Sequence, residues 1–156
     1  MNQPPPMPEP THKPLDMMSL FQMVQDLRGG SDDGILTHEK LKEIAASKDV
    51  PVSHAYAAMV FDPGLAIDAK ESLTIAICTG RCQLFGAIPL LEHLIETMEA
   101  RSAAGEGGFD IVPRNCLDQC DYPPVMISRS SAGICSHRYA KIEDANELLE
   151  ALAQDG

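Results

Sequence analysis

Basic residues are scarce in this chain of 156 residues, which has 12 Lys and Arg against 23 Asp and Glu and a net charge of −11. A nucleic-acid-binding protein normally presents a basic face, so this deficit argues against nucleic acid as a partner. It argues equally against attachment to an anionic membrane surface. Apolar runs are also short: none approaches the roughly 20 residues needed to span a bilayer, so we expect no membrane insertion.

Targeting and nucleotide-binding motifs are missing as well. The first residues, MNQPPPMPEPTHKP, contain no apolar stretch of the kind found in a signal peptide, so we expect a cytoplasmic location. The sequence has no phosphate-binding loop, no dinucleotide-binding glycine fingerprint and no nucleophile elbow. We therefore expect that the chain does not bind NAD or flavin unaided. Its five histidines lack paired metal-binding spacing and are interpreted as surface or packing residues.

Composition and apolar spacing divide residues 1–68 into a tail and a helical segment. Six of the 12 prolines lie within residues 1–14, which predicts a flexible or polyproline-like tail. Residues 15–68 contain three short helical patterns, of which the first ends at Gly29 and Gly30. Thr37 and Ser53 are the predicted N-caps of the other two. Such a bundle has a thin core, so we expect it to pack on the rest of the chain or on a partner.

The spacing of apolar residues changes in the remaining segment, residues 69–156. We predict a buried strand over residues 73–77, an amphipathic helix over 83–100, strands over 109–112, 125–128 and 134–137, and an acidic helix over 142–153. Two helices over a small mixed sheet form the thioredoxin-like arrangement. The predicted fold is therefore α/β: a thioredoxin-like domain of strand, helix, three strands and helix, preceded by a small N-terminal helical bundle.

Four of the five cysteines form two pairs with equal spacing. Cys78 and Cys82 enclose three residues, and so do Cys116 and Cys120. Each pair follows a predicted strand, so the two loops can meet at one edge of the sheet. Four converging thiolates suit an iron–sulfur cluster or a structural zinc ion. Cys135 stands alone in a predicted strand and is interpreted as a buried core residue, because free cysteine is among the most buried residue types.

The three-residue gaps favour iron–sulfur modestly. Structural zinc sites use a two-residue gap most often, although gaps up to four occur. Disulfide oxidoreductases also use the two-residue gap, with a thiol of low pKa at a helix N-terminus. Arg81 and the following helix N-terminus favour the thiolate form of Cys78 and Cys82. A set of four buried cysteines without any ligand role is the remaining interpretation.

Three segments carry a resemblance to a known family: GILTHEKLKEIAASKDVPVSHAYAAMVF, IAICTGRCQLFGAIPLLEHL and GGFDIVPRNCLDQCDYPPVMIS. In this order they resemble the family of the thioredoxin-like [2Fe–2S] E subunits of NADH:quinone oxidoreductase. The same family supplies the small subunit of NAD-dependent formate dehydrogenases and bidirectional hydrogenases. The sequence departs from the family in having three residues, not four, between its first two cysteines, and Asp62 where an aromatic residue is usual.

The resemblance implies a [2Fe–2S] cluster held by Cys78, Cys82, Cys116 and Cys120. It also implies an electron-transfer subunit without a catalytic residue of its own, docked on the flavin/NAD-binding subunit of an NADH dehydrogenase-type complex. FMN and NAD are then expected on that partner only. The alternative is a structural or assembly module of such a complex, whose four-cysteine site holds zinc or is vacant. A free-standing ferredoxin is the third hypothesis, and the helical extension argues against it.

Overall fold

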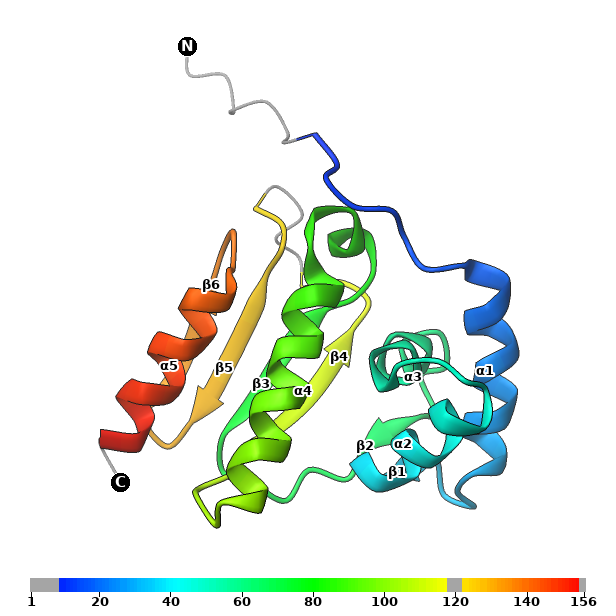
Figure 1. Cartoon of the computed structure of the whole chain (residues 1–156), viewed down its shortest axis with the longest axis horizontal. Coiled ribbons are helices and arrows are strands. Elements are labelled where there is room, and N and C mark those ends of the chain that lie inside the picture. Colours follow the sequence, from blue (N-terminus) through cyan, green and yellow to red (C-terminus); the bar gives the residue numbers. More distant parts are fainter. Residues whose placement is uncertain (1–8, 118–121, 155–156) are drawn as a thin grey trace.

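The computed structural model describes residues 9–117 and 122–154 of the chain (Figure 1). Its helices are α1 (Met17–Gly29), α2 (His38–Ser47), α3 (Val52–Met59), the short 3-10 helix η1 (Arg81–Phe85), α4 (Ala87–Ala103) and α5 (Ile142–Gln154). Its strands are β1 (Ile35–Leu36), β2 (Ala66–Ile67), β3 (Thr74–Cys78), β4 (Asp110–Arg114), β5 (Met126–Ser130) and β6 (Gly133–His137). The predicted order of strands and helices in residues 69–156 is confirmed.

The main sheet has four strands in the order β4-β3-β5-β6. Strands β3 and β4 are parallel and are joined through α4, whereas β5 and β6 are antiparallel additions. Figure 1 shows α4 and α5 on the same face of this sheet. Buried and half-buried residues alternate along β3, and Ile75 and Ile77 supply the buried side. The register places Ile77 between Pro113 and Met126, so the core continues across three strands.

The N-terminal helices pack against the sheet domain and share its core. Buried residues of α1, α2 and α3 belong to the same apolar cluster as those of the main sheet and α4. The small side chains of Ala55, Ala57 and Ala58 are fully buried in α3, which allows close helix packing. His38 of α2 adds a polar link, with Nδ1 2.7 Å from the Tyr56 hydroxyl and Nε2 2.9 Å from Oε1 of Glu99 on α4. The expectation that this thin bundle packs on the rest of the chain agrees with the structure.

Two predicted helix boundaries are wrong. The predicted helix over residues 83–100 is two elements, because Gly86 has a φ of 97° and separates η1 from α4. Glycine accepts this left-handed conformation without the steric cost of a Cβ atom. Ser53 is not an N-cap: α3 begins at Val52 after Pro51, and the buried Ser53 hydroxyl donates to Oε1 of Glu92 at 3.0 Å.

Cys135 lies in β6 as predicted, but it is exposed and not a core residue. Its strand is at the edge of the sheet and pairs with β5 alone. Residues 133–136 are all exposed, so the packed helices do not cover this strand. Among the helices that the structure describes, none combines the length and hydrophobicity required to cross a membrane.

Candidate metal centre

The first cysteine pair lies where β3 ends and η1 begins. Cys78 is the last residue of β3 and Cys82 is the second residue of η1, and each side chain is only 3% exposed. The two sulfur atoms are hydrogen-bonded to each other. A 3-10 turn directly after a buried strand therefore brings two thiols together in an enclosed position, which the sequence spacing alone does not establish.

The parallel pairing of β3 and β4 brings the second cysteine loop beside the first. Cys78 is in register with Arg114, two residues before Cys116. The Thr79 N–H donates to the Arg114 carbonyl at 2.7 Å, and the Cys78 thiol donates to the Asn115 carbonyl at 3.4 Å. Leu117 packs against Cys78, Cys82 and Ala87. The start of the second loop is thus part of the surroundings of the first cysteine pair.

Gly80 permits this close approach of the two loops. A Cβ atom at this position would lie 2.2 Å from the Asn115 carbonyl oxygen and 2.7 Å from its side-chain oxygen. Such separations are far below van der Waals contact, and one of the opposing atoms belongs to the backbone and cannot rotate away. Only glycine fits between the loops, because there is no space for a side-chain atom at this position.

The surroundings of Cys78 favour its thiolate form. The pKa of Cys78 is lowered to about 6, and the hydrogen bond with the Cys82 side chain is the largest cause. Backbone N–H groups of Gly80, Cys82 and Leu117 also lower it, while burial acts in the opposite direction. A thiolate is the form of cysteine that binds a metal. Two buried sulfurs with several N–H donors therefore fit the demands of an iron–sulfur or zinc site.

The structure brings together part of the predicted ligand set. Cys116 follows Asn115 and is exposed, and Cys120 lies outside the described residues. Within residues 9–117 and 122–154, no group of three or more Cys, His, Asp or Glu side chains is arranged to hold a metal ion. Joint ligation by Cys78, Cys82, Cys116 and Cys120 therefore stays a prediction. Sequence reasoning missed Gly80 and Gln83, because their roles depend on contacts with residues far along the chain.

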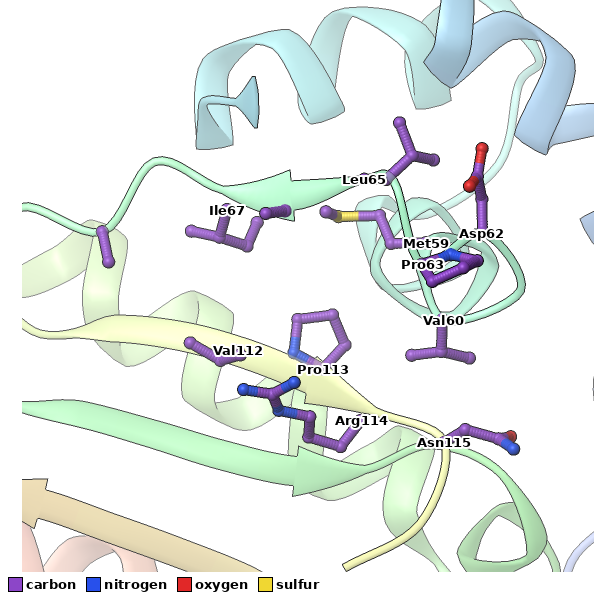
Figure 2. A pocket seen from close by; sticks show the side chains of 12 residues that line it. Met59, Val60, Asp62, Pro63, Leu65, Ile67, Val112, Pro113, Arg114 and Asn115 are labelled. Carbon is purple, nitrogen blue, oxygen red and sulfur yellow. The ribbon is translucent and has the colours of Figure 1, made fainter. Parts of the chain in front are cut away.

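A cavity of about 490 Å³ lies between strand β4 and the segment that runs from the end of α3 to β2 (Figure 2). Met59, Leu65 and Ile67 face Val112 and Pro113 across it. The described residues that line it include no cysteine, but Arg114 and Asn115 at one end of it also contact the first cysteine loop. Its rim contains Asp62, the residue that departs from the family pattern. The Arg28 side chain and the Gly64 N–H donate to Asp62 and lower its pKa, so this carboxylate joins α1 to the turn before β2.

Replacement of Gly80 by alanine tests the close approach of the loops. We expect Gly80→Ala to lower the free energy of unfolding by about 1–3 kcal/mol, the usual cost of inserting an extra carbon into a packed site. Urea unfolding of the purified chain measures this change. Gly29→Ala is the matched control, because no atom lies within 4 Å of a Cβ placed there. Equal stability of Gly80→Ala and wild type would contradict the packing described above.

A mixed four-stranded sheet with α4 and α5 on one face is the thioredoxin-like arrangement, and here it carries a buried cysteine pair at the end of β3. A model of the family of thioredoxin-like [2Fe–2S] ferredoxins matches residues 7–153. Because the match spans nearly the whole chain, the protein belongs to this family, and the family implies a [2Fe–2S] cluster.

Two known proteins from Aquifex aeolicus are similar to this chain. The E subunit of NADH-quinone oxidoreductase from strain VF5 is 29% identical over 119 residues, which are 74% of this chain and 72% of that protein. A solved structure, the wild-type thioredoxin-like [2Fe–2S] ferredoxin, is 18% identical with a TM-score of 0.46. That likeness covers 55% of this chain and 88% of the ferredoxin.

Proposed function

We propose that this protein is the [2Fe–2S] electron-transfer subunit of a multisubunit NADH-linked oxidoreductase. The observation that carries the proposal is the buried Cys78–Cys82 pair beside the loop that leads into Cys116 and Cys120. Family membership and the similarity to the E subunit of a quinone oxidoreductase support it. The four cysteines would hold the cluster, which supplies one-electron chemistry when bound.

The residues around the first pair would have three tasks in this function. Gly80, Cys82 and Leu117 place backbone N–H groups against the Cys78 sulfur and stabilise negative charge there. Leu117 and Ala87 cover the pair and restrict the access of water. Gly80 allows the two loops to lie close enough for a shared centre. None of these tasks requires nucleotide chemistry on this chain.

A partner that carries the flavin and binds NADH follows from electron counting. Hydride transfer moves two electrons, and a [2Fe–2S] centre accepts one, so a flavin must stand between them. This chain has no nucleotide-binding fingerprint. We propose FMN and the NAD site on a partner subunit.

The outer face of α1 is the proposed docking surface for that partner. Met17, Met18 and Phe21 are 50%, 65% and 48% exposed, and the Phe21 ring lies 5.0 Å from the Phe61 ring, centre to centre. Clustered exposed apolar side chains of this kind mark interaction sites. The Leu15 N–H, just before α1, bonds to Gln83 of η1, so this end of the helix lies next to the candidate metal centre. A partner on this face would therefore sit close to the cluster.

An anaerobic NADH titration tests the proposed division of labour. We expect NADH alone to leave the visible spectrum of the iron–sulfur-loaded chain unchanged, and to bleach it once a flavin-containing partner is added. Dithionite, which reduces clusters without a flavin, is the positive control. Bleaching by NADH without flavin would mean that the chain has its own nucleotide site, and absence of bleaching with the partner would refute the electron-transfer role.

A zinc-bound or vacant structural site is the second candidate function. It is favoured by the chemistry of the ligand set, because four cysteine thiolates are also a common ligand set of structural zinc. Metal and sulfide analysis of anaerobically purified protein separates the two functions. Iron and acid-labile sulfide in equal amounts support the electron-transfer subunit, whereas zinc without sulfide supports the structural module.

A further inference from the structure

A segment of the N-terminal tail is hydrogen-bonded to the helix that carries Cys82. We call residues 11–15 the N-terminal strap. The N–H groups of Thr11 and His12 both donate to the Leu84 carbonyl, at 2.9 and 3.0 Å. Carbonyls at the end of a short helix lack partners within the helix, so the strap satisfies one of them from outside. The His12 ring also lies against Gly86, where a Cβ atom would be 3.3 Å from it.

The Gln83 side chain joins this strap to the first cysteine loop. Its Oε1 accepts from the Leu15 N–H at 2.7 Å, and its Nε2 donates to the Thr79 carbonyl at 2.6 Å. Gln83 is only 6% exposed, so both halves of a buried amide are satisfied. Thr79 in turn donates its N–H to Arg114, which leads into the second loop. The hydrogen bonds form one chain from the strap to both cysteine loops.

This chain of hydrogen bonds sets the orientation of one peptide group beside Cys78. The Thr79 carbonyl and the Gly80 N–H belong to the same planar trans peptide unit, so they point in opposite directions. The Gln83 side chain holds the Thr79 carbonyl on one side, so the Gly80 N–H points to the opposite side. This N–H is one of the donors to the Cys78 sulfur. We infer that Gln83, anchored by the N-terminal strap, is a positioning residue that aims the Gly80 N–H at a cluster-ligating sulfur and thereby raises the reduction potential. This inference rests on the proposed function.

The expected direction follows from charge. Reduction adds an electron to the cluster, and hydrogen bonds to the sulfurs stabilise the added negative charge. Loss of the Gln83 amide frees the Thr79–Gly80 peptide, weakens one N–H···S bond and makes reduction harder. We expect Gln83→Met to lower the ratio of reduced to oxidised protein about tenfold at a fixed ambient potential, which corresponds to about 59 mV for one electron.

The experiment is a redox titration of the full-length, iron–sulfur-loaded chain followed by electron paramagnetic resonance. Gln25→Met is the matched control, because Gln25 is exposed on α1. An unchanged midpoint in Gln83→Met with full cluster content would overturn the inference, even if its melting temperature falls. If Gln83→Met holds no cluster, Leu15→Pro decides: proline removes the N–H that bonds to Gln83, and Leu15→Ala keeps it. A lower potential in the proline variant alone supports the inference, and equal potentials overturn it.

A second measurement separates this inference from the proposed function. Hydrogen exchange with mass spectrometry follows the peptide that contains Gly80 in full-length protein, with or without a cluster. Faster exchange there in Gln83→Met than in Gln25→Met supports the positioning role, and equal exchange overturns it. Absence of a [2Fe–2S] signal in the wild-type chain would instead refute the proposed function.

Discussion

Single replacement of Cys78, Cys82, Cys116 or Cys120 by serine is expected to remove the [2Fe–2S] chromophore, whereas Cys135→Ser retains it. Thiolates are the usual ligands of such clusters. Changes to residues outside the first coordination shell already cost 10–100-fold in metal affinity, so loss of a ligand should cost more than about tenfold. Iron and sulfide content, together with visible absorption, measure the effect in the anaerobically purified variants.

Cys135→Ser is the internal control for this series. Cys135 is exposed in the edge strand β6, which pairs with β5 and not with the strands that precede the paired cysteines. Far-ultraviolet circular dichroism should show that all five variants keep their secondary structure. Full iron and colour in Cys116→Ser or Cys120→Ser would refute the four-cysteine assignment. Loss of the chromophore in Cys135→Ser would indicate that Cys135 on β6 is a ligand of the cluster.

Met18→Glu is expected to prevent co-purification with the flavin-containing partner without loss of the cluster. Met18 is 65% exposed on α1 and is the most exposed residue of the proposed docking surface. A carboxylate buried there without a counter-charge carries a large desolvation cost. The few hot-spot residues of an interface contribute about 2 kcal/mol or more each, so as a hot spot Met18 is expected to lose about 30-fold or more in affinity. Titration calorimetry of each variant with the isolated partner measures the change in affinity.

Ile134→Glu is the matched control, because Ile134 is also 65% exposed but lies in β6. Figure 1 shows β6 and α1 on opposite sides of the molecule. The control should bind the partner as wild type does. If Met18→Glu binds normally and Ile134→Glu does not, the docking surface lies on the open edge of the sheet. Deletion of the helices is a poorer test, because they share one apolar core with the sheet and with α4.

The order of elements could be predicted from the sequence because it depends on local patterns. The apolar run in residues 73–77 and the four-and-three spacing of apolar residues over residues 84–98 each need only a few neighbouring positions. The cap at Thr37 is also local: its hydroxyl accepts from the Lys40 N–H at 3.1 Å, three residues away. The paired spacing of Cys78 with Cys82, and of Cys116 with Cys120, indicated a metal centre for the same reason.

Long-range packing decided the rest. Cys135 is exposed because β6 is the last strand of the sheet, and strand order is not encoded in a five-residue pattern. Gly80 must be glycine because Asn115, 35 residues later in the chain, lies against it. Gln83 bonds to Leu15 across 68 residues. Local periodicity determines which elements form, whereas the partners of a buried amide or of a close-packed glycine depend on how those elements are placed, and only the tertiary structure determines that.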